Sequence, residues 1–421
     1  MLPEGWKRVT VEESCSVVSV GIVVNPSHYY VEETEGVIAF RSQNVRENRV
    51  NEQNWAYISA EGQKKNTKSI LKSGDVVVVR TGFAGTACVV PPHLDGSNCI
   101  DILFARPKPE QLLPEYLSEL TNSDPGRRQV LNGQSGLAQK HLNVSAYEKL
   151  SFPLPPIAEQ RKLIELFDTW NDAIATTGNL LANSRSQKQV LMQQLLTGKR
   201  RVQKFVISNA RLATRFGSIP EDWRHVPIEQ VAREFSAKNA ADRQLPVLSC
   251  TKYGGLVDSL SYFNKQVFSQ DVSTYKLVER GCFAYATNHI DEGSIGYQNL
   301  YDVALISPMY TVFKPSNDID HGYLFKLMKT EHYRQIFAAN TNASVDRRGS
   351  LRWGDFKKIE IPLPSIAEQV AISGIIDSAQ LEIESIQKQF DRLKDEKRAL
   401  MQQLLTGKRR VRLPVHEAAR A

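Results

Sequence analysis

The sequence of 421 residues has no long apolar run and few cysteines. Apolar runs such as Val76–Val79 are far too short to cross a bilayer, so we expect no membrane association. The stretch Met1–Trp6 lacks the apolar core that a signal peptide needs. The five cysteines are odd in number and form no Cys-x-x-Cys pair, which predicts reduced thiols and a cytoplasmic protein.

Motifs for catalysis and for metal binding are also missing. Asn25-Pro26-Ser27-His28 only partly matches the Asn/Asp-Pro-Pro-Tyr/Phe motif of amino-methyltransferases, and no Phe-x-Gly-x-Gly loop for S-adenosylmethionine accompanies it. Gly198-Lys199 and Gly407-Lys408 look like the end of a Walker A loop, but the upstream glycine is absent and an arginine follows each lysine. The eight histidines show no metal-ligand spacing. The chain is therefore predicted to be non-catalytic, with no metal site.

Composition adds only a mild indication of the partner. Hydrophobic residues make up 41% and charged residues 24% of the chain, as in ordinary globular proteins. Lys and Arg outnumber Asp and Glu by 53 to 46, a net charge of +7. This excess favours an anionic partner without proving one.

The strongest feature is an internal repeat. Met192–Val202 and Met401–Val411 both read MQQLLTGKRRV, and Pro153–Gln160 (PLPPIAEQ) matches Pro362–Gln369 (PLPSIAEQ) at the same offset of 209 residues. The two 50-residue blocks between these ends align without a gap and share 22 identities. The chain is therefore a tandem duplication.

Each repeated block is predicted to form one long helix of about 39 residues, which corresponds to roughly 58 Å. Prolines precede the Ile-Ala-Glu-Gln segments, and Gly198 and Gly407 follow the expected helix ends. Apolar residues recur with heptad spacing in the second block, and a more polar seam that includes Gly178 has the same spacing in the first. Two matching seams favour helices that pack on each other. The alternative is two separate amphipathic helices, each packed on its own domain.

The globular parts that precede the helices correspond more faintly. Pro3–Trp6 (PEGW) matches Pro220–Trp223 (PEDW). A buried strand is expected at Gly74–Val79 and again, 207 residues later, at Gly281–Tyr285. A polar, glycine-bearing loop follows each strand, and a short helix follows later in each copy. A shared frame with different loops is expected if the loops carry recognition.

Two divergent domains, each closed by a P-L-P-x-I-A-E-Q block and an L-L-T-G-K end, resemble the DNA specificity subunit of type I restriction–modification systems. The resemblance covers the whole chain. It implies an α+β fold with two similar target recognition domains joined by two long antiparallel coiled-coil helices. It divides the chain into target recognition domain 1 (residues 1–152), a central helical spacer (153–204), target recognition domain 2 (205–361), a distal helical spacer (362–411) and a tail (412–421).

The resemblance also implies a function and a set of partners. Each target recognition domain reads one half of a split, asymmetric site on double-stranded DNA, and the helices measure the spacer between the halves. The chain itself binds no cofactor. Two methyltransferase subunits carry out adenine-N6 methylation with S-adenosylmethionine, and restriction subunits use ATP and Mg to cut unmodified DNA, as a host defence in the prokaryotic cytoplasm.

Polar and basic residues in the loops are the candidates for DNA contact, because groove readout requires hydrogen-bonding side chains. In the first domain they are Arg41, Gln43, Asn44, Arg46, Arg80, Thr81, Gln134, Lys140 and His141. In the second domain they are Lys252, Tyr253, Asn288, His289, Ser344, Arg347, Arg348 and Ser350. For each of them the alternative is an ordinary solvated loop residue.

Two basic runs follow the predicted helix ends, and both alternatives for them stay open. They consist of Lys199, Arg200 and Arg201 in the first copy and Lys408, Arg409 and Arg410 in the second. Cations suit a helix C-terminus electrostatically, but these residues could also contact phosphates or dock another subunit. Two rival functions for the whole chain are a standalone or fused adenine DNA methyltransferase and a coiled-coil scaffold with no DNA role.

Overall fold

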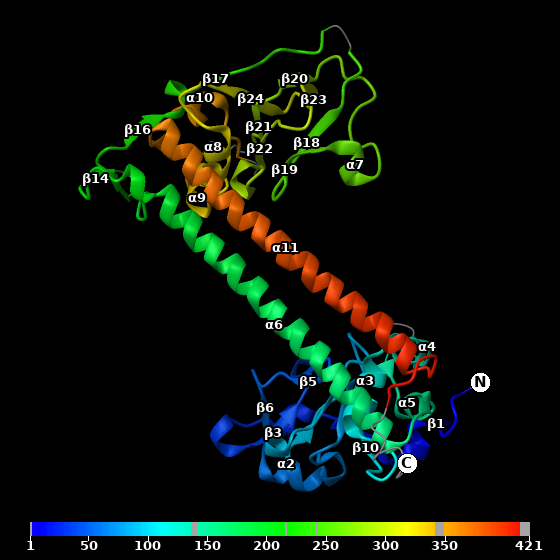
Figure 1. Ribbon diagram of the computed structural model, residues 1–421. Coiled ribbons are helices and arrows are strands. Elements are labelled where there is room, and N and C mark those ends of the chain that lie inside the picture. The colour runs from blue at the N-terminus through cyan, green and yellow to red at the C-terminus, as the bar shows by residue number, and fades with distance from the viewer. Residues whose placement is uncertain (1, 136–140, 215–216, 241–242, 342–348, 413–421) are drawn as a thin grey trace. The chain divides into compact units, whose positions relative to one another are not determined.

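The computed structural model describes residues 2–135, 141–214, 217–240, 243–341 and 349–412 (Figure 1). The chain divides into two compact units. Unit 1 comprises Met1–Asn179 with Gln387–Ala421, and unit 2 comprises Leu180–Ile386. Both units mix helices with strands, as the predicted α+β class requires.

Unit 1 is built around an antiparallel sheet in the order β2–β10–β7–β8. Strand β7 is the buried Val76–Val79 run predicted from the sequence, and all four of its residues are buried. A second sheet has the order β6–β3–β9, and β1 pairs with β13. The strands are β1 (Lys7–Thr10), β2 (Cys15–Val20), β3 (Val37–Phe40), β4 (Val45–Arg46), β5 (Arg49–Val50), β6 (Ala56–Ile58), β7, β8 (Ala87–Val89), β9 (Asn98–Cys99), β10 (Ile102–Pro107), β11 (Gln134–Ser135), β12 (His141–Leu142) and β13 (Ser151–Leu154).

Short helices cover the sheets of unit 1. Helix α3 is the short helix expected later in the first copy, and its Tyr116, Leu117 and Leu120 are all buried. The helices are α1 (Val11–Ser14), α2 (Ala60–Lys65), α3 (Pro114–Asn122), α4 (Asp124–Asn132) and α5 (Val144–Glu148).

Unit 2 repeats this plan with a second four-stranded sheet. One sheet has the order β17–β24–β21–β22 and the other β19–β18–β23–β20, while β16 pairs with β25 as β1 pairs with β13. The strands are β14 (Arg211–Thr214), β15 (Gly217–Pro220), β16 (Arg224–Pro227), β17 (Ala232–Glu234), β18 (Val247–Thr251), β19 (Gly255–Asp258), β20 (Lys276–Glu279), β21 (Phe283–Ala286), β22 (Ile295–Tyr297), β23 (Val303–Ile306), β24 (Tyr310–Pro315) and β25 (Glu360–Leu363). The short helices are α7 (Ser259–Phe263), α8 (His321–Met328), α9 (Glu331–Asn340) and α10 (Trp353–Phe356).

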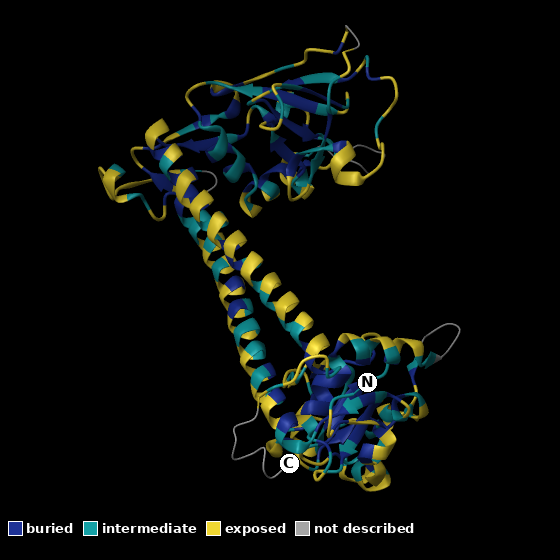
Figure 2. Cartoon of the chain, turned by 45° about the vertical axis from the view of Figure 1, so that its right-hand side comes forward, coloured by how far each residue is buried: buried dark blue, intermediate teal, exposed yellow. Residues whose placement is uncertain are grey.

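The two long helices form where the sequence predicted them. Helix α6 spans Ile157–Leu196, with 40 residues, and α11 spans Ile366–Leu404, with 39 residues. Each helix contributes one part to each unit. Figure 2 shows that buried residues gather in the sheet-containing part of each unit, whereas the long helices carry many exposed residues.

Within each unit, a segment of α6 packs on a segment of α11. In unit 1 a Cβ atom at Gly178 would lie 3.2 Å from the Phe390 ring, which explains a glycine inside the predicted seam. In unit 2 Leu181 packs with Ile383 and Ile386 in one buried cluster. In unit 1 Asn171 also meets Lys397, and in unit 2 Lys188 meets Gln380. Within each unit a later residue of α6 meets an earlier residue of α11, so the paired segments run antiparallel.

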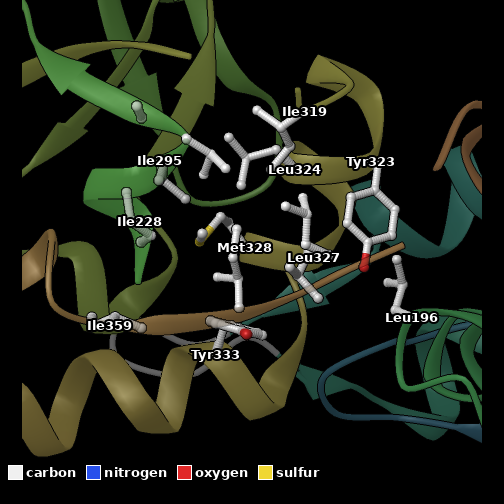
Figure 3. Close-up of a cluster of buried hydrophobic side chains, with 14 of the residues drawn as sticks. Leu196, Ile228, Ile295, Ile319, Tyr323, Leu324, Leu327, Met328, Tyr333 and Ile359 are labelled. Carbon is white, nitrogen blue, oxygen red and sulfur yellow. The ribbon is translucent and has the colours of Figure 1, made fainter. Parts of the chain in front are cut away.

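The end of each long helix belongs to the core of the unit that holds it. In unit 2, Leu195 and Leu196 join the main hydrophobic cluster, and Figure 3 shows Leu196 beside Tyr323 of α8. In unit 1, the end of α11 supplies Met401, Leu404 and Leu405 in the same way. The end of α6 therefore completes the fold of unit 2, and the end of α11 completes that of unit 1.

Two features that other functions would require are absent from the described residues. No helix there is long and apolar enough to span a membrane. No group of three or more His, Cys, Asp or Glu residues in this part of the chain could hold a metal ion.

Candidate functional site

In unit 1, the loop that follows β7 meets the segment that begins at His141. The Thr81 hydroxyl lies 2.7 Å from His141 Nδ1, and the backbone N–H of Leu142 donates to the carbonyl of Arg80 at 2.9 Å. Three predicted DNA-binding residues, Arg80, Thr81 and His141, are thus brought together from positions 60 residues apart. Gln134 is half-buried on the neighbouring strand β11, where it pairs with Leu142.

In unit 2, the equivalent loop has the same backbone frame. The N–H of Leu351 donates to the carbonyl of Thr287 at 2.8 Å, just as Leu142 donates to Arg80. Ser350, which is half-buried, directly precedes Leu351. Asn288 is half-buried in this loop, and His289 is exposed with its Nδ1 atom 3.2 Å from Glu292. The frame is shared, and the side chains on it differ.

Arg80 is held by a carboxylate inside unit 1. Its Nη1 atom lies 3.0 Å from Asp101, and 18% of its side chain is exposed. The ion pair sets the direction of the guanidinium group, so Arg80 presents a fixed geometry at the base of the loop. A fixed guanidinium suits bidentate recognition of a base or a phosphate.

The Arg41–Arg46 segment separates into residues that shape the loop and residues that face solvent. Asn44 is fully buried, and its amide donates to the carbonyls of Asn51 and Gln53 at 3.0 and 3.1 Å. Its Oδ1 atom accepts from the N–H of Arg41 at 3.1 Å. Asn44 is therefore an interior residue that organises the loop, and its side chain has no exposed surface for the predicted DNA contact. The sequence pattern could not distinguish a buried amide from an exposed one.

The other predicted residues of this segment lie at the surface. Arg41 and Gln43 both donate to the carbonyl of Asn54, at 3.0 and 2.6 Å. Arg46 is exposed on β4, in a short hairpin with β5. Gln43 and Arg46 thus have side chains that a ligand could reach without unfolding the loop.

In unit 2, a half-buried lysine, Lys329, joins two of the predicted segments. Lys329 Nζ donates to the carbonyls of Lys252 and Gly293, at 2.9 and 2.7 Å, and burial lowers the pKa of Lys329. The turn that carries Lys252 and Tyr253 is therefore fixed next to the loop that contains His289. Tyr253 is 88% exposed, and the Lys252 ammonium lies 5.5 Å from its ring centroid. The sequence does not indicate this role of Lys329, because the residue lies just after α8, far along the chain from both loops.

Four of the predicted contact residues lie outside the described residues. They are Lys140, Ser344, Arg347 and Arg348.

The basic runs after the long helices contain both largely buried and exposed side chains. Arg201 binds two carboxylates: its Nε lies 2.6 Å from Glu368 and its Nη1 lies 2.8 Å from Asp222. Its guanidinium also lies 5.3 Å from the centre of the Trp223 ring, and only 8% of the side chain is exposed. These partners raise the pKa of Arg201 further above its usual range, despite burial. Arg201 is therefore an internal ion-pair residue with little exposed surface, and its contact with a phosphate or a subunit stays a prediction.

Arg410 occupies the equivalent place in unit 1. It pairs with Glu159, and the indole N–H of Trp6 donates to the same carboxylate at 3.0 Å. Trp223 donates to Glu368 at the same distance in unit 2. The repeated motifs thus meet in one cluster per unit, a Trp–Glu–Arg cluster, defined as Trp6–Glu159–Arg410 in unit 1 and Trp223–Glu368–Arg201 in unit 2. The remaining residues of the basic runs are exposed, namely Lys199, Arg200, Lys408 and Arg409.

Glycines allow the helix tails to reach these clusters. A Cβ atom at Gly198 would lie 2.4 Å from Pro220, and one at Gly407 would lie 2.6 Å from Pro3. Any larger residue would push the tail away from the PEGW or PEDW segment. The identity of MQQLLTGKRRV in both copies therefore has a structural cause, since each tail is built into a folded unit.

Comparison with known proteins identifies the kind of protein that has this arrangement. Residues 220–396 match the family model described as type I restriction modification DNA specificity domain. The type I restriction enzyme MjaVIII specificity subunit of Methanocaldococcus jannaschii is 24% identical over 292 residues, a match that covers 66% of this chain and 66% of that relative. The putative MjaX specificity subunit of the same organism is 21% identical over 438 residues, 98% of this chain and 95% of the relative.

Solved structures share the fold along nearly the full chain. The HsdS subunit from Thermoanaerobacter tengcongensis is 19% identical with a TM-score of 0.51, covering 96% of this chain and 98% of that one. The S subunit from M. genitalium is 10% identical with a TM-score of 0.54, covering 97% of each chain. A chain from a study of complex assembly and conformational transition in the type I R-M system is 19% identical with a TM-score of 0.61, covering 97% and 99%.

These matches show that residues 220–396 resemble a DNA specificity domain of type I restriction–modification systems, and that the chain is similar to specificity subunits. More narrowly, it is a relative of type I restriction enzyme specificity subunits, so the resemblance predicted from the repeated motifs is confirmed.

Proposed function

We propose that this chain is the non-catalytic subunit that reads a bipartite, asymmetric DNA site for a type I restriction–modification enzyme. One observation carries the proposal. The loops after β7 and β21 have the same backbone frame, with Leu142 bonded to Arg80 and Leu351 to Thr287, but carry different side chains. Two copies of one backbone frame that carry different side chains suit recognition of two different half-sites on one duplex.

In this proposal the chemistry belongs to partner subunits. Two methyltransferase subunits with S-adenosylmethionine methylate adenine N6, and restriction subunits with ATP and Mg cut unmodified DNA, in the prokaryotic cytoplasm. The absence of an S-adenosylmethionine loop from the sequence supports this division and speaks against a standalone or fused methyltransferase. The chain then contributes recognition alone.

We further propose that α6 and α11 pair as an antiparallel coiled coil that sets the spacer between the half-sites. The contacts of Leu181 with Ile383 and Ile386, and of Gly178 with Phe390, fall on the predicted seam and support this pairing. The division into recognition domains at 1–152 and 205–361, helical spacers at 153–204 and 362–411, and a tail at 412–421 is part of the same proposal.

The central test is methylation by the reconstituted complex. The purified chain alone should neither methylate nor cut DNA, and adding its methyltransferase subunits should give methylation of a split site that depends on S-adenosylmethionine. Replacing residues 1–150 with the matching part of a relative should change one half of the methylated motif and leave the other. Methylome sequencing reads this directly. Methyl transfer by the chain alone would support the fused-enzyme alternative, and no DNA binding in any combination would support the scaffold.

A matched insertion tests the helices as a ruler. Seven residues inserted at equivalent points of α6 and α11 preserve the heptad register and lengthen the pair by about 10.5 Å, at about 1.5 Å per residue. Because one base pair of duplex occupies about 3.4 Å, the methylated motif should gain a spacer of roughly three base pairs. An insertion of three or four residues should break the register and abolish methylation. If the seven-residue variant still methylates the original spacing, the helices do not set the spacer length.

A further inference from the structure

Phe83 is the most conspicuous side chain in the loop after β7, because it is apolar and yet 86% exposed. It lies in the connection between β7 and β8, whose neighbouring strand residues are buried. The hydroxyl and the backbone N–H of Thr86 both donate to the Phe83 carbonyl, at 2.9 and 3.2 Å. The backbone is thus held in place while the ring extends into solvent, where an apolar group gains nothing.

Two exposed arginines lie on a hairpin that is bonded to the same connection. The N–H of Asn48, in the turn between β4 and β5, donates to the carbonyl of Ala87 at 2.9 Å, one residue after Thr86. Arg46 and Arg49 are opposite each other on these strands, and both are exposed. Arg49 forms no ion pair with any other described residue. A hollow of about 550 Å³ lies beside them, lined by Arg46, Arg49, Val50, Asn51, Glu52 and Gln53.

Unit 2 differs at the position that corresponds to Phe83. Counted from the matching strands β7 and β21, that position is Ile290, which is fully buried. A short 3-10 helix, Ile290–Glu292, turns the chain inward there, and Arg334 donates to the carbonyl of Asp291 at 3.1 Å. An exposed apolar tip at this place in the frame is therefore a property of unit 1.

We propose that Phe83 is a wedge that inserts between two neighbouring base pairs of the half-site read by unit 1, while Arg46 and Arg49 bind phosphates beside it. An aromatic ring can enter a base step because every base offers a π-face, and such insertion unstacks and kinks the duplex. Arginines on both strands of the adjacent hairpin supply the opposite charge that the flanking backbone requires. The half-site read by unit 2 is not wedged in this way, so the two halves are recognised by different physical means. The inference rests on the proposed DNA-reading function.

The experiment uses the complex of this chain with its methyltransferase subunits and a duplex that carries the motif methylated by the wild-type complex. The fluorescent base 2-aminopurine, placed at each position of both half-sites in turn, reports loss of stacking. The residue 1–150 exchange identifies the half-site that belongs to unit 1. We expect fluorescence to rise at one step of that half-site and at none in the other.

Substitutions then assign the signal to the ring. Phe83→Ser should abolish the fluorescence rise and weaken binding about tenfold, because a stacked or inserted aromatic residue contributes on the order of 1–3 kcal/mol. Phe83→Leu keeps an apolar wedge and should retain most of both effects. Leu212→Ser, which removes an exposed apolar residue from unit 2, is the matched control and should change neither. A thermal melt of each variant checks folding, which a residue 86% exposed should not disturb.

Each outcome bears on a defined claim. If the wild-type complex methylates no DNA, the proposed function fails and the wedge fails with it. If it methylates a split site and Phe83→Ser binds as tightly with the same fluorescence, the wedge alone is wrong. Weaker binding by Phe83→Ser with an unchanged fluorescence rise would also overturn insertion, because the ring would then contact only the surface of the duplex.

Discussion

The two units place equivalent residues where the sheet-containing part of the unit meets the long helices, but with different charges. In unit 1, the Lys397 ammonium lies 3.1 Å from Glu119 and donates to Asn171 at 2.6 Å. In unit 2, the residue at the place of Glu119 is Lys326, and the residue at the place of Lys397 is Lys188. The carboxylate that binds a lysine in one unit is therefore replaced by a second lysine in the other.

Unit 2 accommodates this replacement with other groups. Lys326 pairs with Asp377 at 2.9 Å, and Lys188 donates to Gln380, the counterpart of Asn171, at 2.7 Å. Burial, and then the positive charge of Lys326, lower the pKa of Lys188. The same lysine at the same helix position thus completes an ion pair in unit 1 and carries an electrostatic cost in unit 2. Duplication preserved the helix frame, while each unit acquired its own charge balance.

The Trp–Glu–Arg clusters differ in one residue of the repeated motif. The PEDW segment of unit 2 contributes Asp222, whereas the PEGW segment of unit 1 has Gly5 at this place. Arg201 consequently has two carboxylate partners and is 8% exposed, while Arg410 pairs with Glu159 and is 45% exposed. A single residue therefore separates a buried ion-pair network from a more solvated pair.

Exchanging the charges at the domain–helix junction should have the largest effect. Glu119→Lys gives unit 1 the residue of unit 2, so the new ammonium group meets Lys397 at a buried position, beside Asp168, which has the place of Asp377. We expect unit 1 to lose about 4–5 kcal/mol of stability, in the range for breaking a buried ion pair, because Lys397 loses Glu119 and meets a second cation. The reciprocal Lys326→Glu should cost less, because the new carboxylate would face Lys188. Chemical denaturation of both variants measures the difference, and equal losses would show that the two junctions are equivalent.

Removing the glutamate of a Trp–Glu–Arg cluster should have the second-largest effect on stability. Glu368→Ala leaves Arg201 with one carboxylate and the Trp223 indole without its acceptor, for which we expect a loss of about 3–4 kcal/mol. Glu159→Ala in unit 1 should cost about 1–2 kcal/mol, because water can solvate the more exposed Arg410. The comparison of the two melting profiles tests whether burial decides the size of the effect. A larger loss for Glu159→Ala would contradict this reading.

A smaller effect is expected when unit 2 receives the motif of unit 1. Asp222→Gly should destabilise unit 2 by about 1–2 kcal/mol, through loss of hydrogen bonds to a charged partner. The hydrogen bond from Arg201 lowers the pKa of Asp222, so its contribution is present above the unfolded-state pKa of about 3.9 and is lost as pH falls through the lower folded-state pKa. The variant and the wild type should therefore converge in stability at strongly acidic pH. Urea denaturation at several pH values tests this, and a constant difference would exclude the ion pair as its cause.

The smallest effect should come from Lys188→Met. Methionine keeps the apolar stem and removes a cation whose pKa is already lowered, so the stability of unit 2 should change by less than about 1 kcal/mol. The matched Lys397→Met in unit 1 should be clearly worse, because it leaves Glu119 buried without its cation. Similar values for the two variants would remove the distinction between the junctions.

The sequence by itself determined the duplication, the two long helices, the buried strand at Val76–Val79 and the likeness to specificity subunits. These features depend on identity at a fixed offset and on local periodicity, which a linear sequence displays. The positions of the helix ends could be predicted for the same reason, since prolines precede both helices and Gly198 and Gly407 follow them.

Only the tertiary structure decided what individual polar residues do. Asn44 is an interior amide, Arg201 lies in an internal ion-pair network, and Phe83 is exposed on the loop that Arg80 and Thr81 begin. Burial depends on which distant segments pack together. The C-terminal end of α6 packs into the core of unit 2, and the C-terminal end of α11 packs into the core of unit 1. No local pattern encodes such pairings, because they arise from contacts about 150 to 250 residues apart in the chain, such as Trp6 with Glu159 and Arg410 with Glu159.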